Sequence, residues 1–499
     1  MKRCTAPTVL LLTALLLAAC GEASHGSGTE DTASLSDDTT GTVTEAASGD
    51  ERAPYTDIAP EVCDFGGYTY RIFANDNTDS GIKQYYSSEE TGDLVNDAVF
   101  RRNSAVCDRY NINIAPVVGF THENDRATAM KLLQAGDDFA DVTALLLIQD
   151  SMKLAQEGAL LDWNDYPVLR TDAPWWDARI TDLEVYGKQY VVTGCIATAD
   201  DMRQMVVTYN KSIWSEMDYE DPYNMVTEGR WTLDRMYALA KDVSHDLNGD
   251  GEMTAADRWG IVSESKAAWY LYLGSGKTSI HYENGQYLSN LADETGFDIL
   301  NRVIEIMSDT ATVCVMNDGR HERELTTADI WTEASKIFEE SRTLFRTETF
   351  NGTERLRNMG QDYGVLPIPK WTEEQDAYYC MTNDDIGMLS LPTTVSDPER
   401  TALITEALAY ESMFELQPTF YEVYLSEKLL RDEQSRAMMD LTLASKFYDM
   451  DYCFGALTGM SSAMESMAKT KKNQLASKAA SLEKNAQSKI DKFLSALSD

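Results

Sequence analysis

The chain has 499 residues, of which 43% are hydrophobic and 10% aromatic, so it carries enough apolar surface for more than one core. Asp and Glu number 82 against 43 Lys and Arg, a formal charge of −39, which makes nucleic acid and anionic lipid poor partners. The length predicts two lobes, and no segment after the first twenty residues has the length and apolarity of a membrane span.

The chain begins with a short secretory signal. Lys2 and Arg3 form the charged start, residues 9–17 are an apolar run too short to cross a bilayer, and two alanines precede Cys20. This pattern is typical of a bacterial lipoprotein, so we expect residues 1–19 to be a signal peptide that is removed and Cys20 to carry a fatty acyl (palmitate) anchor. The alternative is an ordinary cleaved signal with an incidental cysteine.

The next segment has the composition of a tether. Residues 21–60 are rich in Ser, Thr, Gly, Asp and Glu, so they bury too little surface to offset their chain entropy. We assign residues 20–62 to the acylated cysteine and a disordered tether. Six further cysteines follow at wide spacings without a CxxC motif, and both disulfides and free thiols remain open for them.

The first folded segment alternates strands and helices. Residues 68–74, 112–118 and 141–148 have strand character, while 94–110 and 126–133 have helical periodicity. Strand, helix, strand, helix, strand is the pattern of a parallel sheet covered by helices.

Ligands bind beyond the carboxyl ends of the strands in such sheets. This rule nominates Asn75 and Asp76 after the first strand and the loop of Gln149 and Asp150 after the third. Plain turn chemistry accounts for the same residues equally well.

Further elements follow in the second part of the chain. Strands are predicted at 190–192 and 205–209, on either side of Asp200 and Asp201, and a helix opens near Trp231. An amphipathic segment, a strand and a long Lys-rich terminal helix complete the expected elements, at residues 330–345, 362–367 and from about 466.

A twelve-residue loop between these elements resembles an EF-hand. Positions 1, 3, 5 and 12 carry side-chain oxygens, position 6 is a turn-forming Gly, and position 7 would offer a backbone carbonyl. The ligands would be Asp246, Asn248, Asp250, Glu252 and Asp257. We expect a structural Ca²⁺ of moderate affinity, because Asp257 replaces the usual bidentate Glu; the alternative is a polar Gly-containing turn.

Seven segments, taken in order, resemble the extracellular solute-binding lipoproteins of carbohydrate-type ABC transporters, in the clostridial style. They are GDDFADV (136–142), LLDW (160–163), APWWD (173–177), GKQY (187–190), YNK (209–211), GRWTLD (229–234) and YGVLPIPK (363–370). The resemblance covers nearly all of residues 65–460. Each segment alone is weak, whereas their order and spacing together are specific.

This resemblance implies an α/β fold of two lobes, the periplasmic-binding-protein fold (type II-like), with a hinge and an interlobe ligand cleft that closes on the solute. The chain would cross between lobes near 195, 330 and 390. Lobe 1 would hold residues 63–195 plus 333–390, and lobe 2 residues 196–332 plus 391–499, ending in the Lys-rich helix.

A sugar-binding cleft needs aromatic rings for the C–H faces of the sugar and polar side chains for its hydroxyls. Aromatic and acidic candidates are Trp175, Trp176, Trp269, Asp200 and Asp201. The resemblance adds Arg342 and Phe345, in a segment where the family often lines its cleft. Core packing or a solvated surface explains any one of these residues equally well.

The expected function is a non-enzymatic receptor that captures a carbohydrate, of the oligosaccharide class, and delivers it to an ABC transporter permease. It would act as a monomer outside the cytoplasm, held to the cell membrane through its lipid alone. GxSxG, HExxH and P-loop motifs are absent from the sequence. A surface-anchored glycoside hydrolase, or a receptor for a peptide or other solute, remains the alternative.

Overall fold

A computed structural model describes residues 51–75, 81–117, 124–356, 359–360, 362–421 and 433–498. The chain divides after Asp50, and the unit that begins at Glu51 holds all the described elements. The expected signal peptide, Cys20, most of the expected tether and Asp76 lie outside the described residues.

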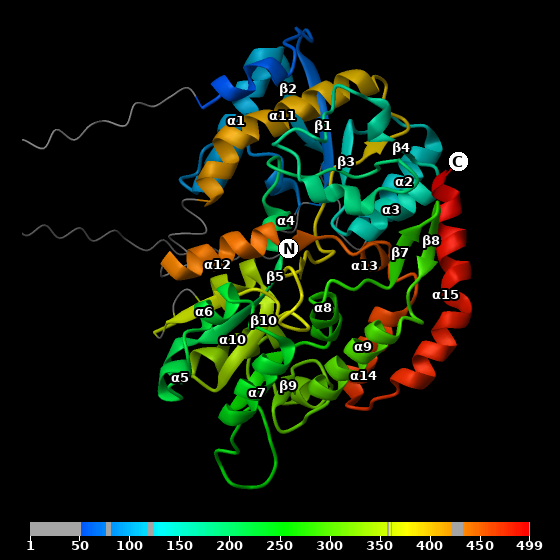
Figure 1. Cartoon of the computed structure of the whole chain (residues 1–499). Coiled ribbons are helices and arrows are strands. Elements are labelled where there is room, and N and C mark those ends of the chain that lie inside the picture. Colours follow the sequence, from blue (N-terminus) through cyan, green and yellow to red (C-terminus); the bar gives the residue numbers. More distant parts are fainter. Residues whose placement is uncertain are drawn as a thin grey trace, which may run out of the picture. The chain divides into compact units, whose positions relative to one another are not determined.

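The first sheet has three parallel strands in the order β2-β1-β3 (Figure 1). They are β1 (Tyr68–Ala74), β2 (Ile112–Val117) and β3 (Val142–Ala144), connected through α1 (Leu94–Tyr110) and α2 (Asp125–Ala135). The predicted strand and helix alternation is therefore confirmed, and the predicted helix at 94–110 has the predicted bounds. The third strand is shorter than predicted, because α3 (Ile148–Gln156) already begins at Ile148.

Local capping explains why α1 begins and ends where it does. The Asp93 carboxylate accepts the backbone N–H groups of Val95 and Asn96, which satisfies two of the free donors of the first turn. Asn111 then takes a left-handed conformation, φ 48°, and stops the helix.

The second sheet has five strands in the order β11-β5-β10-β6-β9, of which β6, β9 and β10 run parallel. Their bounds are β5 (Met205–Asn210), β6 (Trp259–Ser263), β9 (Val313–Val315), β10 (Thr343–Thr349) and β11 (Tyr363–Leu366). The helices that accompany them are α7 (Leu233–Val243), α8 (Ala267–Leu273), α9 (Glu294–Met307) and α10 (Ile330–Glu339).

The remaining elements are shorter or lie near the C-terminus. They are η1 (Ala53–Ile58), η2 (Ile82–Gln84), β4 (Leu160–Leu161), η3 (Trp163–Asp165), η4 (Ala178–Leu183), α4 (Ala199–Met202), α5 (Lys211–Glu216), α6 (Pro222–Thr227), β7 (Ile280–Glu283), β8 (Gln286–Ser289), η5 (His321–Arg323), η6 (Phe350–Leu356), β12 (Cys380–Met381), β13 (Leu391–Pro392), α11 (Pro398–Thr419), α12 (Glu433–Ala444), β14 (Lys446–Phe447), α13 (Met450–Cys453), α14 (Met460–Thr470) and α15 (Leu475–Ser498).

The expected division of residues 333–499 between the lobes is wrong in two places. Strands β10 and β11, assigned to lobe 1, pair with β5 and β6 of the second sheet, so the chain does not leave that sheet near residue 330. Helix α11, assigned to lobe 2, packs beside α1 and buries its residues in the first core. Burial of apolar side chains explains both placements. Most apolar residues of α11 lie in the first core, and Leu344 and Phe345 of β10 are fully buried in the second.

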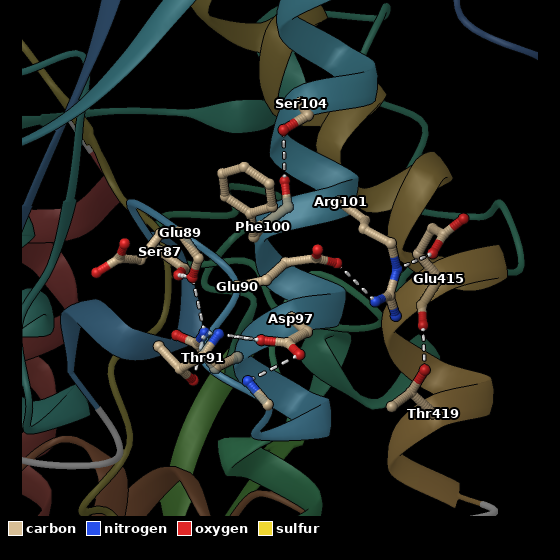
Figure 2. Close-up of polar contacts among 12 residues, drawn as sticks. Ser87, Glu89, Glu90, Thr91, Asp97, Phe100, Arg101, Ser104, Glu415 and Thr419 are labelled. Atoms are coloured by element: carbon tan, nitrogen blue, oxygen red, sulfur yellow. Dashed lines mark hydrogen bonds and ion pairs between the residues drawn. The ribbon is translucent and has the colours of Figure 1, made fainter.

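Figure 2 shows part of the contact between α1 and α11. The Arg101 guanidinium lies 3.2 Å from Glu90, in the loop before α1, and 3.3 Å from Glu415 on α11. The Asp97 carboxylate accepts the backbone N–H of Thr91 at 2.7 Å. These polar contacts fasten the loop before α1 to the helix pair.

Helix α11 also holds the start of the folded unit, which begins earlier than the tether prediction allowed. Arg52 lies 2.6 Å from the Glu411 carboxylate, and its guanidinium stands 4.7 Å from the ring centroid of Phe414. Within residues 51–62, predicted as tether, Tyr55, Ile58 and Ala59 pack against the first core.

The predicted Lys-rich terminal helix is two helices, because Lys471, with φ 56°, ends α14 before α15 begins. Helix α15 joins both cores: Leu475 and Ala486 belong to the second, Ile490 and Leu494 to the first. The six cysteines from Cys63 to Cys453 are free thiols. Within the described residues, no helix combines the length and apolarity that crossing a membrane requires.

Candidate functional site

A cavity of about 730 Å³ lies where strands of both sheets reach their carboxyl ends. Leu147 and Gln149 line it from the chain that follows β3, Glu264 from the end of β6, and Thr347 and Thr349 from the end of β10. This is the edge at which α/β sheets bind ligands. The carboxyl-edge rule thus locates the cavity: of the described residues nominated with it, Gln149 lines the cavity, whereas Asn75 and Asp150 do not.

Trp331 supplies an aromatic surface to this cavity. It stands in the first turn of α10, where Asp329 caps the helix by accepting the backbone N–H of Thr332 at 2.8 Å. Its side chain is 50% exposed, and no other tryptophan in the described part of the chain is exposed. A half-exposed indole in a cavity wall is suited to stacking on an apolar ligand face.

Two charged residues of β10 give the cavity a buried polar wall. Arg346 and Glu348 form an ion pair at 3.0 Å and are both almost fully buried. Arg346 also donates to the Ser335 hydroxyl at 2.9 Å, and the Thr208 hydroxyl donates to Glu348 at 3.1 Å. Burial lowers the pKa of Arg346 and raises the pKa of Glu348. Because these contacts hold both side chains in place, the wall is preorganised for hydrogen bonding.

The charged groups of the lining balance one another. Cations and anions are equal in number: Arg203, Lys266, Arg346 and Arg355 against Glu264, Glu348, Asp384 and Asp385. Arg203 and Asp385 lie 3.2 Å apart, and burial raises the pKa of Glu264 and of Asp384. The whole chain has a charge of −39, whereas the charges in the cavity wall balance. A wall without net charge favours a neutral polar solute over an ion.

The expected stacking residues Trp175 and Trp176 lie elsewhere, in the first core. Both are buried, and their indole N–H groups donate to the two oxygens of Glu406 on α11, at 2.9 and 2.7 Å. Their assignment as ligand contacts is wrong, because an enclosed ring cannot stack on a solute.

Glu406 makes the stability of this core pH-dependent. Burial raises its pKa to about 7, against the opposing effect of the indole donors, so the folded chain binds a proton that the unfolded chain releases near pH 4.5. The free energy of unfolding should therefore fall as pH rises from about 4.5 through 7. Glu406→Gln, which does not titrate, should show a smaller decrease in Tm between pH 5.5 and 8 than the unaltered protein.

The matched control for this experiment is Glu415→Gln, since Glu415 is a partly exposed carboxylate on the same helix. Its Tm difference between the two pH values should equal that of the unaltered protein. An equal difference in Glu406→Gln would show that Glu406 does not titrate in this range.

Four more expected ligand residues do not line the cavity. Trp269 is buried and donates to Asp449 at 3.2 Å, while Phe345 packs 5.5 Å from the Trp231 ring in the second core. Arg342 binds Glu340 and the carbonyl of Ala255, and Asp150 pairs with Arg126 and Lys153. These assignments are corrected in the same way: neighbouring elements already occupy each side chain.

Asn75 is also buried, at the carboxyl end of β1, where its carbonyl accepts the backbone N–H of Ile82 at 2.7 Å. It does not line the cavity. Asp76, predicted beside it, lies outside the described residues.

Asp200 and Asp201 belong to an ion cluster rather than to the cavity. The Lys446 ammonium lies 2.8 Å from Asp200, 2.5 Å from Asp201 and 2.9 Å from Asp177. Burial raises the pKa of Asp200 despite this ammonium. The cluster connects η4, α4 and β14, so its role is to hold elements together at the crossing into β5.

The EF-hand-like loop has an internal hydrogen-bond pattern that follows its spacing. The Asp246 carboxylate accepts the backbone N–H groups of Gly249 and Gly251 at 2.7 and 2.8 Å, which holds the pKa of Asp246 below its usual value. Asp257 is buried and accepts the N–H of Leu247 at 3.0 Å across the loop. As the side chains stand, no group of three or more His, Cys, Asp or Glu in the described ranges could hold a metal ion.

Apart from Gln149, the residues that line the cavity were not predicted from the sequence. Trp331 was identifiable in part, because it stands in the first turn of the predicted amphipathic segment, two residues after a helix-capping aspartate. Arg346 and Glu348 carried a weaker signal, two charges at alternate positions within an apolar strand.

Similarity to known proteins lies in the fold rather than in the sequence. No protein-family model and no curated protein matches the chain. Among solved structures, it is similar to a cyclo/maltodextrin-binding protein complexed with maltotetraose (13% identity, 84% of this chain and 96% of that one, TM-score 0.56) and to a Rhizobium etli sugar transporter in an open conformation (11%, 84% and 99%, 0.57). An ABC substrate-binding protein from Listeria monocytogenes in complex with cycloalternan is also similar (12%, 87% and 100%, 0.53).

These likenesses cover most of the chain and establish its fold. It is the two-lobe α/β fold of periplasmic binding proteins, as expected, with one sheet in each lobe. The apo-form of RafE from Streptococcus pneumoniae, 15% identical over 85% of this chain and 98% of its own, with TM-score 0.52, shares it.

Proposed function

We propose that this protein is a non-enzymatic receptor that captures a neutral oligosaccharide in the 730 Å³ cavity and delivers it to an ABC transporter permease. The observation that carries the proposal is the combination of one exposed indole with a charge-balanced, preorganised polar wall at the carboxyl edge of both sheets. Sugars offer apolar C–H faces and hydroxyls that donate and accept, so this lining matches both. The similar structures include a maltotetraose complex, a sugar transporter and a cycloalternan complex, which supports the class of solute.

A thermal-shift screen tests the proposal. The chain without residues 1–20 is titrated with mono- and oligosaccharides, and the products are examined by chromatography. A ligand that binds only the folded state raises Tm with concentration, whereas a non-ligand leaves it unchanged. A rise with one sugar series and no cleavage supports the receptor. Cleaved sugar would support the glycoside hydrolase instead, and a rise with peptides alone would change the solute class.

We further propose that Cys20 bears the lipid that holds the receptor, as a monomer, to the outer side of the cytoplasmic membrane. The charged, apolar and small-residue order of the first twenty residues supports this anchor. Cys20→Ala should release the protein from the membrane fraction. Retention of the variant in that fraction would contradict the proposal.

We also propose that the loop from Asp246 to Asp257 binds a structural Ca²⁺. The donor spacing supports it, and Gly251, at position 6, has the left-handed φ of 84° that a sharp turn requires. The oxygen ligands would be the side chains of Asp246, Asn248, Asp250 and Asp257 and the carbonyl of Glu252. Binding requires the exposed Asn248 and Asp250 and the partly exposed Asp246 to turn their side chains inward.

Calcium should therefore raise Tm in a concentration-dependent way, and EGTA should reverse the increase. Asp250→Asn together with Asp246→Asn should abolish the response, because two carboxylate ligands are removed. Mg²⁺ is the matched control ion, since it demands a smaller octahedral site. An unchanged Tm in calcium would identify the loop as a polar turn.

A further inference from the structure

A second cavity, of about 420 Å³, lies away from the first and shares none of its lining residues. The chain forms it mainly from η4 and the turn after it, the hairpin β7–β8 and the junction of β14 with α13, with further residues after α8 and Tyr379 before β12. Figure 1 shows β7 and β8 beside the C-terminal helix α15. Six aromatic residues line the cavity: Tyr186, Tyr282, Tyr287, Tyr379, Phe447 and Tyr448.

Three of these tyrosines form a cluster in which two rings are exposed and Tyr287 is buried. The Tyr282 and Tyr287 ring centroids are 4.7 Å apart, and Tyr186 lies 5.1 Å from Tyr287 in an edge arrangement. Tyr282 is 57% exposed and Tyr186 39%, although large apolar side chains elsewhere in the described residues are mostly buried. The Tyr287 hydroxyl donates to the carbonyl of Glu184 at 2.9 Å, which ties the hairpin to the turn.

The backbone at Tyr186 points to a function for its ring. Tyr186, with φ 52°, and Gly187, with φ 83°, form a two-residue turn closed by paired hydrogen bonds between Val185 and Lys188. Such turns favour Asn or Asp before the Gly, because a bulky side chain is strained at positive φ. A tyrosine that takes this strained conformation, with an exposed ring, is typical of a binding surface.

The inner wall carries an unsatisfied acceptor. Asp449 is 1% exposed, and its Oδ2 accepts the indole N–H of Trp269 and the backbone N–H of Tyr452. Its Oδ1 has no hydrogen-bond partner among the described residues. A buried carboxylate oxygen without a donor is costly, and a ligand hydroxyl would satisfy it once the enclosed Asp449 side chain turns toward the cavity.

We propose that this cavity is a second carbohydrate-binding site. One sugar ring would stack on Tyr186 and Tyr282, and a hydroxyl of that sugar would donate a hydrogen bond to Asp449. The ion-paired Arg179 and Asp182, 2.9 Å apart, stand at the same wall and offer a further donor and acceptor to sugar hydroxyls. The site requires no contribution from the first cavity, so a receptor for a long oligosaccharide or polysaccharide could hold it at two points.

The test uses the Trp331→Ala protein, in which binding at the first cavity is weakened, and it assigns to the second cavity only the binding that the tyrosine variants reduce. The probes are the tetrasaccharides of the malto, cello, manno, xylo and arabino series at up to about 10 mM, followed by saturation-transfer NMR and calorimetry. At least one should bind. Tyr282→Ala and Tyr186→Ala should each weaken that binding about fivefold or more, as the loss of one stacking ring predicts.

Tyr282→Phe is the matched control, because it keeps the ring and should bind within about twofold of its Trp331→Ala parent. Tyr186→Asn should lose binding and yet raise Tm by about 1–2 °C, since Asn accepts the left-handed turn. No binding of any probe, or binding that both Tyr→Ala variants retain, would overturn the proposal. If Trp331→Ala leaves binding of the unaltered strength and the tyrosine variants remove it, the first cavity is not the sugar site and this one is.

Discussion

Trp331→Ala is expected to weaken oligosaccharide binding by about 10- to 30-fold while leaving Tm almost unchanged. The indole is half exposed in the first cavity, so its removal deletes a stacking surface and opens no cavity in the core. A tryptophan at the centre of a binding surface contributes on the order of 2 kcal/mol, and about 1.4 kcal/mol is tenfold in affinity. Calorimetric titration with the sugar found in the thermal-shift screen measures the effect.

Two variants control this experiment. Trp331→Phe keeps an aromatic face and should retain most of the affinity. Leu247→Ala removes a side chain that is 54% exposed on the EF-hand-like loop, outside the cavity lining, and should change nothing. Equal affinity of Trp331→Ala and Leu247→Ala would remove Trp331 from the site and leave the proposed function without its main support.

Lys446→Met should destabilise the protein by about 3–5 kcal/mol at pH 7.5, because it leaves the buried Asp200 and the partly buried Asp177 and Asp201 without their common partner. In the variant, repulsion and burial raise the pKa values of these carboxyls in the folded state. The folded chain then binds protons that the unfolded chain releases, so stability is lost as pH rises and partly recovered at pH 5. Urea unfolding at both pH values measures the difference.

A partly exposed pair provides the comparison. Lys153 lies 3.4 Å from Asp150 with 36% of its side chain exposed, so Lys153→Met should cost less than about 1 kcal/mol at either pH. Adding Asp200→Asn to Lys446→Met should restore part of the stability at pH 7.5, since it removes one of the uncompensated charges. A loss in Lys446→Met that does not depend on pH would mean that packing of the lysine stem, rather than its charge, stabilises the cluster.

Elements whose signals are local agree well with the structure. The α1 helix has its predicted bounds because Asp93 and Asn111, which start and stop it, are adjacent to it in the sequence. The parallel order β2-β1-β3 follows from alternating strands and helices, since a crossover helix connects parallel neighbours.

Predictions that depended on distant residues fared worse. Trp175 and Trp176 stand beside Asp177 and look like loop aromatics, yet Glu406, 230 residues away from Trp176, accepts both indoles and buries them. In the sequence, Asp200 and Asp201 resemble carboxylates that bind sugar hydroxyls. In the fold, both accept hydrogen bonds from the ammonium of Lys446, which lies more than 240 residues later in the chain.

The local elements, the parallel first sheet and the edge of that sheet where a ligand can bind are all specified by the order of the amino acids. Capping, hydrophobic periodicity and strand order act over a few residues or one crossover, so they can be read along the chain. Only the folded molecule showed which aromatic rings are exposed and which charges are paired. It also showed which lobe contains β10 and which contains α11. Those outcomes depend on contacts between segments far apart in sequence, where burial competes with solvation for each side chain.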